Sequence, residues 1–187
     1  MKKILFAIVL LTAFAASGQT KFFTKKGKVS FDATAAKSPE QIRAINENAI
    51  SVIDINSGAM EFMVSMTAFN FEKALMQEHF NENYVESEKY PKANFKGTVT
   101  NIKEVNLSKD GVYPVNVKGN MTLHGVTKEV TATGSLTTKG GSIVSGKSEF
   151  KILFSDFNIE IPKVVTDKLA NEAKIKVDVN YEPVAAK

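Results

Sequence analysis

The clearest hydrophobic pattern in the chain lies in Val112–Gly134, with the sequence VYPVNVKGNMTLHGVTKEVTATG. If His124 and Gly125 form a two-residue loop, one face of the resulting hairpin is almost wholly apolar or small and the other is polar. Such a loop needs positive φ, which glycine adopts freely and histidine tolerates better than a branched residue. An antiparallel sheet with one dry face and one wet face follows. The dry-face pairs are Leu123 with Val126, Met121 with Lys128, Gly119 with Val130, Val117 with Ala132, and Val115 with Gly134.

Alternation of apolar and polar residues predicts strands in most of the remaining chain. The segment 38–45 favours a short turn or helix, and 165–170 a helical turn. The expected strands are two short ones joined by a turn at Gly27 within residues 21–35, then 49–56, 59–67, 93–105, 141–154 and 172–181, with a short extended piece at 157–161.

One segment, residues 71–83, has the period of an α-helix, because Phe71, Leu75 and His79 recur at steps of four, and Asn70 can cap it. About eight strands with one helix and no strand–helix alternation predict an all-β protein whose antiparallel strands close into a barrel or split into two sheets. A barrel of eight strands encloses just enough space for its own side chains or for one small ligand.

The first residues have the pattern of a cleaved secretory signal peptide. Lys2 and Lys3 precede the apolar run Ile4–Ala16, and small residues follow. The run is shorter than the roughly 20 residues that a membrane-spanning helix needs, which disfavours the alternative of an uncleaved anchor.

Cleavage after Gly18, which leaves Gln19 first, fits the preference for small residues at the cut, and cleavage after Ala15 is the alternative. The expected organisation is a signal peptide over residues 1–18 and one exported domain over 19–187. A domain of this length can bury a core of its own.

The amino-acid composition excludes several kinds of site and partner. No cysteine occurs, which excludes disulfides, thiolate chemistry and a lipoprotein-type cleavage site. Removing Lys2 and Lys3 from the 24 basic residues leaves 22 against 20 acids, a net charge of +2. With the two signs mixed along the chain, no nucleic-acid partner is expected.

The sequence gives no argument for an enzyme. Its two histidines, His79 and His124, share no local spacing and have no acidic cluster around them, so no metal site is predicted. For His124 a turn residue that bonds nearby backbone is favoured over a ligand contact, and for His79 a half-buried helix position. No phosphate-binding loop, nucleophile elbow or zinc-protease motif is present, and no cofactor is expected.

The apolar faces of the strands remain as the main signal. Periodicity alone favours an ordinary filled core, but methionine suits an adaptable apolar site. Small residues on the dry face, Gly119, Ala132 and Gly134, leave volume unless aromatics such as Phe62 and Phe95 fill it.

Lys128 is the exception on the dry face, where its register places it opposite Met121. An unpaired buried ammonium is costly. Lys128 is therefore expected to reach water along its own stem, with contact to an anionic headgroup as the alternative.

Three segments together resemble the YceI-like family of exported lipid-binding proteins: Leu75–Val99, Val117–Val130 and the closing strand IKVDVNY. The family has a helix leading into a tyrosine-proline step and then F-x-[SG], here Tyr90-Pro91 and Phe95-Lys96-Gly97. It also has G-x-L-T-x-H-G-V-T, here GNMTLHGVT with Met121 in the usual leucine place.

The resemblance, which extends over residues 27–181, implies a lipocalin-like antiparallel barrel with an elongated apolar cavity for a polyisoprenoid or similar long-chain amphiphile. It also implies a periplasmic location, although the signal alone leaves secretion outside the cell open. The chain lacks the histidine-bearing F-x-V-x-H stretch with which the family usually begins, so the resemblance leaves open the front of the barrel and any pocket contact made there.

The resulting hypothesis is a binding protein that carries or sequesters a polyisoprenoid, quinone or fatty-acid derivative. The alternative is a filled barrel that acts through a surface contact, and a homodimer stays open. The candidate ligand-binding residues are Met60, Phe62, Val64, Met66, Phe95, Val99, Val117, Met121, Lys128, Val130, Phe150 and Ile152. Val115 lies on the same dry face and could also point inward.

Overall fold

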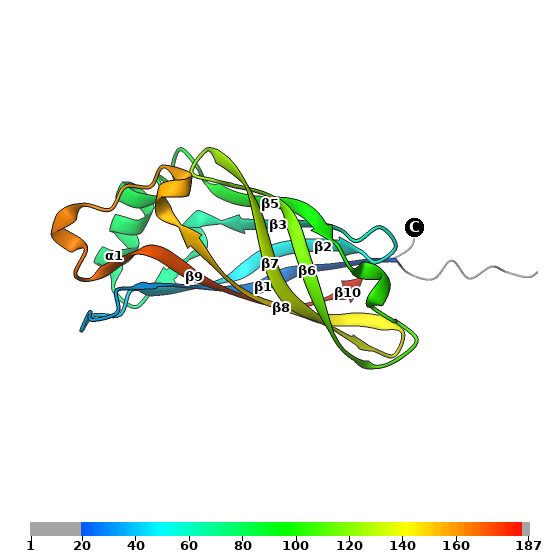
Figure 1. Ribbon diagram of the computed structural model, residues 1–187. Helices are drawn as coiled ribbons and strands as arrows, with labels where there is room; N and C mark the ends of the chain where they lie inside the picture. The colour runs from blue at the N-terminus through cyan, green and yellow to red at the C-terminus, as the bar shows by residue number, and fades with distance from the viewer. Residues whose placement is uncertain (1–19, 185–187) are drawn as a thin grey trace, which may run out of the picture.

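Eight antiparallel strands pair edge to edge into a closed, elongated barrel (Figure 1). This architecture comes from a computed structural model that describes residues 20–184, so the predicted signal peptide and its cleavage site lie outside the described residues. The strands are β1 Lys21–Thr34, β2 Arg43–Asp54, β3 Ala59–Ser65, β4 Asn70–Phe71, β5 Lys92–Val99, β6 Gly111–Leu123, β7 Val126–Lys139, β8 Ser142–Leu153, β9 Leu169–Asn180 and β10 Glu182–Pro183.

The barrel closes because β1 pairs with both β2 and β9. Around the ring the order is β1-β9-β8-β7-β6-β5-β3-β2, and the two-residue strands β4 and β10 extend it on β2 and β1. The predicted all-β barrel of eight antiparallel strands is therefore confirmed. Its short helices are α1 Ala74–His79, the π-helical turn Phe80–Tyr84 and the 3₁₀ turns Met66–Ala68, Ile102–Glu104, Phe154–Phe157 and Lys163–Val165.

The β6–β7 hairpin has the predicted register, from Leu123 opposite Val126 to Val115 opposite Gly134. His124 and Gly125 both have positive φ, 50° and 74°, as a two-residue loop requires. The hairpin is thus determined by its own sequence, because one register satisfies both the loop and the apolar face.

The helix was predicted three residues too early. Asn70 and Phe71 form β4 and pair with Ile45 and Ala44 of β2, so Asn70 is not the cap. The Phe71 ring lies 5.0 Å from that of Phe80. Strand pairing and this aromatic contact outweigh the helical period at the first residue of the pattern.

The first strands are longer than predicted. β2 begins at Arg43, where a turn or helix was expected, because its first residues pair with β1. Gly27 lies at an irregularity within one continuous strand β1, not in a turn. A Cβ at Gly27 would meet Val179 at 2.8 Å, so the glycine allows close packing across the barrel.

Three other boundaries differ from the predictions. The strand expected over 93–105 ends at Val99 and is followed by the 3₁₀ turn Ile102–Glu104. The 3₁₀ turn Phe154–Phe157 takes the place of the start of the extended piece. In the region of the expected helical turn at 165–170, Lys163–Val165 is a 3₁₀ turn and β9 already begins at Leu169.

Strands β7 and β8 separate part-way along the barrel. Their pairing runs from Lys139 opposite Ser142 to Gly134 opposite Ser148 and goes no further within residues 20–184. Figure 1 shows the two strands diverging from there, with the turn Phe154–Phe157 beyond the end of β8. The first half of β7 therefore keeps only β6 as its strand neighbour in the described chain.

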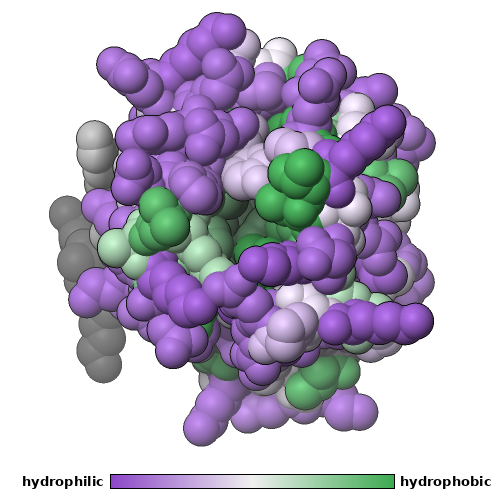
Figure 2. Space-filling view, turned by 90° about the vertical axis from the view of Figure 1, so that its left-hand side faces the viewer, coloured by the Kyte–Doolittle hydropathy of each residue, from purple (hydrophilic) through white to green (hydrophobic). Residues whose placement is uncertain are grey.

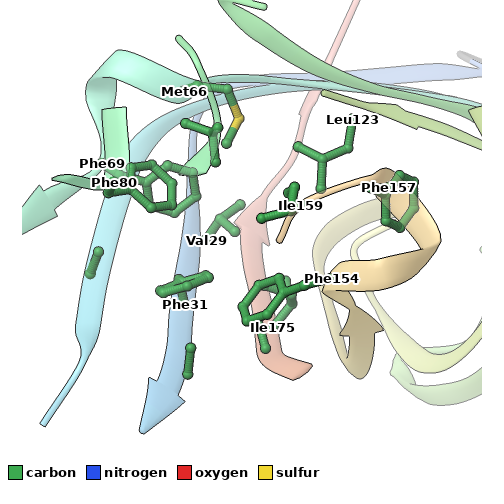
Figure 3. Close-up of a cluster of buried hydrophobic side chains, with 14 of the residues drawn as sticks. Val29, Phe31, Met66, Phe69, Phe80, Leu123, Phe154, Phe157, Ile159 and Ile175 are labelled. Carbon is green, nitrogen blue, oxygen red and sulfur yellow. The ribbon is translucent and has the colours of Figure 1, made fainter. Parts of the chain in front are cut away.

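Two apolar clusters lie toward opposite ends of the barrel. One contains Phe22, Ile53 and Ile143, each 0% exposed, and includes Ile102 of the 3₁₀ turn after β5. The other gathers side chains of β1, α1 and the loops around Phe31 and Phe80, and Figure 3 shows its residues arranged around an open space. Between these clusters lies the interior that the strand periodicity left ambiguous.

Candidate functional site

The barrel is hollow. A cavity of about 600 Å³ runs inside it, lined by side chains from every barrel strand except β2, together with α1 and three loops. Its size falls within the roughly 300–1,000 Å³ typical of small-molecule sites, and its walls are almost entirely apolar.

Ten of the twelve predicted site residues line this cavity, as does Val115. Most of them, such as Phe62 on β3 and Val117 on β6, point inward yet are only half-buried, since they face the cavity and not packed neighbours. The ten are Met60, Phe62, Val64, Met66, Phe95, Val117, Met121, Val130, Phe150 and Ile152.

The other two predicted residues do not line the cavity. Val99 points inward but is 1% exposed among Phe22, Ile53 and Ile102, so it belongs to the cluster that fills one end. Lys128 lies opposite Met121 as its register requires, yet it is exposed. It reaches water because β8 has already left β7 at this height.

The small residues of the hairpin have two different roles. A Cβ at Gly119 would lie 2.4 Å from Gly97 Cα and 2.8 Å from the Phe95 ring, so this glycine pair makes room for an aromatic side chain. Ala132 and Gly134, by contrast, line the cavity directly. Only the second pair contributes to the hollow interior.

A group of phenylalanines surrounds the cavity at one end. The Phe31 ring lies 5.5 Å from Phe80, 6.3 Å from Phe69 and 6.4 Å from Phe154, between ring centroids. The pairs with Phe80 and Phe69 are edge-to-face and the pair with Phe154 is tilted, and such aromatic pairs add to the stability of an apolar cluster. We call Phe31, Phe69, Phe71, Phe80 and Phe154 the aromatic collar; all five line the cavity.

The cavity opens beside the aromatic collar, at the end of the barrel that carries α1. Figure 2 looks onto this end and shows a hollow with apolar side chains in its depth and a largely polar surround. Leu75, Met76 and His79 of α1 contribute to the cavity wall here. His79 is an exposed residue of this rim, so the expected half-buried position was wrong.

Three charged residues from three different loops meet at the same rim. The Glu40 carboxylate lies 2.5 Å from the Lys73 ammonium and 3.8 Å from that of Lys168. The hydrogen bond from Lys73 is the main reason why the pKa of Glu40 is lowered, and the same bond raises the pKa of Lys73. All three side chains line the cavity.

Toward the filled end, one polar pair faces the apolar interior. The Tyr181 hydroxyl and the Ser51 hydroxyl lie 2.9 Å apart, and both residues are buried. Burial raises the pKa of Tyr181 to about 12, although the Ser51 hydrogen bond acts in the opposite direction. Tyr181 also lines the cavity, whereas Ser51 does not.

His124 is a turn residue, as expected, and does not line the cavity. Its ring bonds groups distant in sequence: Nδ1 donates to the Phe157 carbonyl at 3.0 Å, and Nε2 lies 2.6 Å from the Glu86 carboxylate. The Tyr90 ring meets it edge-on at 4.8 Å. Through these contacts, His124 holds the tip of the β6–β7 hairpin against two loops.

Within residues 20–184 no three histidine, cysteine, aspartate or glutamate side chains gather where they could hold a metal ion. No helix in the same range is long and apolar enough to cross a membrane.

Sequence reasoning missed the aromatic collar and the charged rim. Phe31 alternates correctly within its strand, but Phe69, Phe80 and Phe154 belong to turns and helices whose side-chain directions no simple period gives. Glu40, Lys73 and Lys168 are far apart in sequence and resemble other surface charges. Only the closure of the barrel brings them together.

Comparison with known proteins agrees with this architecture. The family model described as "YceI-like domain" matches residues 6–181. No curated protein gave a significant match.

Two solved structures share the fold. A polyisoprenoid binding domain from Saccharophagus degradans, implicated in plant cell wall breakdown, is 12% identical with a TM-score of 0.72, over 89% of this chain and 99% of that one. BcnA from Burkholderia cenocepacia is 17% identical with a TM-score of 0.66, over 84% of this chain and 96% of that one.

Proposed function

The chain belongs to the YceI-like domain family, and on that premise we propose that it is an exported protein that holds a long-chain apolar ligand in its barrel cavity, for carriage or sequestration. The ligand class is a polyisoprenoid, a quinone or a fatty-acid derivative. The fold shared with the polyisoprenoid binding domain from Saccharophagus degradans supports this class.

The observation that carries the proposal is the hollow interior. A cavity of about 600 Å³ with apolar walls is costly to leave as empty space in a protein interior, where side chains normally pack closely. Transfer of a ligand methylene from water into such a site contributes roughly 0.8 kcal/mol. A chain of many methylenes or isoprene units thus binds with few polar contacts.

Native mass spectrometry of protein purified from its own host, followed by lipid extraction, tests the proposal. We expect a co-purifying long-chain lipid, and after delipidation we expect binding of fluorescent acyl or isoprenoid probes. A ligand-free protein that also fails to bind these probes would favour the alternative, a barrel that acts through a surface contact.

A pair of variants ties binding to the cavity. Val117 lines the cavity, whereas Thr131 lies on the outer face of the neighbouring strand and is exposed. We expect Val117→Phe to reduce probe binding and Thr131→Phe to leave it unchanged. Equal effects of the two variants would contradict binding in the cavity.

Export is part of the proposal and has its own test. The mature protein recovered from the periplasmic fraction is expected to begin at Gln19, or at Ala16 if the alternative cleavage site is used. Intact-mass measurement distinguishes these two from the uncut chain, whose recovery as the major form would contradict export by a cleaved signal.

A further inference from the structure

The charges that line the cavity are unequal in sign. Among the described residues, three lysines and one glutamate line it: Lys73, Lys147, Lys168 and Glu40. Lys147 pairs with Asp178 at 3.1 Å, and both of those side chains are at least half exposed. The remaining three gather at the open end, where two ammonium groups share the one carboxylate that lines the cavity, and Glu72, which does not line it, also acts electrostatically on Lys73.

The arrangement of these three groups is that of an oxyanion site. Glu40 Oε1 accepts from Lys73 at 2.5 Å, while Glu40 Oε2 lies 3.8 Å from Lys168. Each ammonium therefore faces a different oxygen of one carboxylate. A fatty-acid carboxylate or a prenyl phosphate can present two oxygens in the same way.

An incoming anion can replace the ion pairs of Glu40 with little loss of stability. The side chains of Lys73 and Lys168 are 60% and 51% exposed, and ion pairs at such positions contribute little to stability. Glu40 itself lies in the loop between β1 and β2, outside both strands. An incoming anion can take over one or both lysines without breaking a strand pair.

The position of the three groups fits a headgroup. Lys73 directly precedes α1, and Glu40 and Lys168 meet it there, at the end of the barrel where Figure 2 shows a hollow with a largely polar surround. A chain inserted past the collar would leave its polar end beside them. Glu40 and Lys73 also line a second, more polar hollow, together with Arg43 and Glu72.

We propose that Lys73 and Lys168 form a headgroup site at the cavity mouth for a long-chain amphiphile with an anionic carboxylate or phosphate, and that the headgroup replaces Glu40 there. This inference rests on the proposed function, because the chain of the amphiphile occupies the cavity. It adds that the protein prefers an anionic amphiphile over a neutral one of the same chain.

The test uses matched probes on delipidated full-length mature protein, below their critical micelle concentrations. Palmitate is compared with hexadecanol, and farnesyl phosphate with farnesol, by competition against a fluorescent probe. We expect the anionic member of a pair to bind roughly fivefold to tenfold more tightly, and this preference to shrink as salt is raised. The two pairs separate a carboxylate preference from a phosphate preference.

Three variants assign the preference to named residues. Lys73→Met combined with Lys168→Met is expected to abolish the preference, measured as the ratio of the anionic to the neutral affinity within each pair. Glu40→Gln removes the competing carboxylate and is expected to strengthen anionic binding several-fold, which is a gain that a misfolded variant cannot give. Lys163→Met is the matched control, because Lys163 is exposed on the same loop as Lys168 and does not line the cavity.

The outcomes separate this inference from the function it rests on. If both members of each pair bind equally well to the wild-type protein, or if Glu40→Gln leaves anionic binding unchanged, the headgroup site is refuted and the apolar carrier stands. If neither member binds, the proposed function itself is refuted. If Lys163→Met removes the preference as fully as the double variant does, general surface charge explains it.

Discussion

A larger side chain that points into the cavity from the middle of the sheet should stabilise the protein. In a barrel with a filled core, the same substitution should destabilise it. Val117 of β6 is paired on both sides, with Val99 of β5 and Ala132 of β7, and its side chain lines the cavity. Val117→Phe keeps a strand-compatible residue and adds four side-chain carbons. In a tightly packed core, such an insertion costs about 1 to 3 kcal/mol.

The expected magnitude follows from the surface that the new ring covers. Four added carbons would contribute about 3 kcal/mol if they were completely buried, at roughly 0.8 kcal/mol each. Val117 itself is only half-buried, so about half of that is realistic, and Val117→Phe should stabilise the delipidated protein by about 1 to 2 kcal/mol.

Urea unfolding of protein delipidated by unfolding and refolding measures this difference, provided that the slope with urea stays constant. Thr131→Phe, on the exposed outer face, is expected to change stability by less than about 0.5 kcal/mol. Loss of more than 1 kcal/mol in Val117→Phe, with the outer control unchanged, would refute the hollow interior at this position.

Three further predictions test other parts of the barrel. Tyr181 keeps its proton up to about pH 12 when folded but releases it near pH 10 when unfolded, so wild type should lose about 3 kcal/mol relative to Tyr181→Phe as pH rises from 10 to 12. Below pH 10 wild type should be the more stable by about 1 kcal/mol through the Ser51 hydrogen bond, and a pH-independent difference in denaturant unfolding would contradict this. Gly119→Ala places a Cβ 2.4 Å from the backbone of β5 and should lower stability in urea unfolding by about 2 to 3 kcal/mol. The control Gly111→Ala meets only ordinary contacts at 3.5 Å and should leave stability nearly unchanged. Equal losses of stability would show that the close approach of the strands is not the cause. His124→Asn keeps a residue type that tolerates positive φ but removes both ring hydrogen bonds. Thermal unfolding should show a loss of about 1 to 3 kcal/mol of stability. An unchanged melting temperature would mean that the ring does not hold the hairpin tip in place.

The strands of this barrel follow from local pattern where a turn and an apolar face agree. The β6–β7 hairpin is the best case, since the loop at His124 and Gly125 permits one register and that register alone gives a dry face. The helix shows the limit. Phe71 fits both a helical period and a strand, and pairing with Ala44 of a distant strand decides for β4.

Alternation gave the inward direction of the candidate residues, whereas the neighbouring elements decide which of them line the cavity. Phe62 and Met121 line the cavity as expected. Val99 has the same inward direction but lies at a level where Phe22 leaves no space beside it. Lys128 also has the inward register, yet β8 has left the sheet there and water reaches the side chain.

By itself, the sequence determined that the chain forms about eight antiparallel strands and which side chains share the apolar face of each, while the barrel followed from the family resemblance. Those properties depend on a two-residue period and on turns that each involve neighbouring residues. Only the tertiary structure decided that the interior is hollow, because empty volume is the difference between the space the whole ring encloses and the sum of all the side chains within it. The same closure brought Glu40, Lys73 and Lys168 together at the mouth, since their proximity depends on where three separate loops end and on no spacing along the chain.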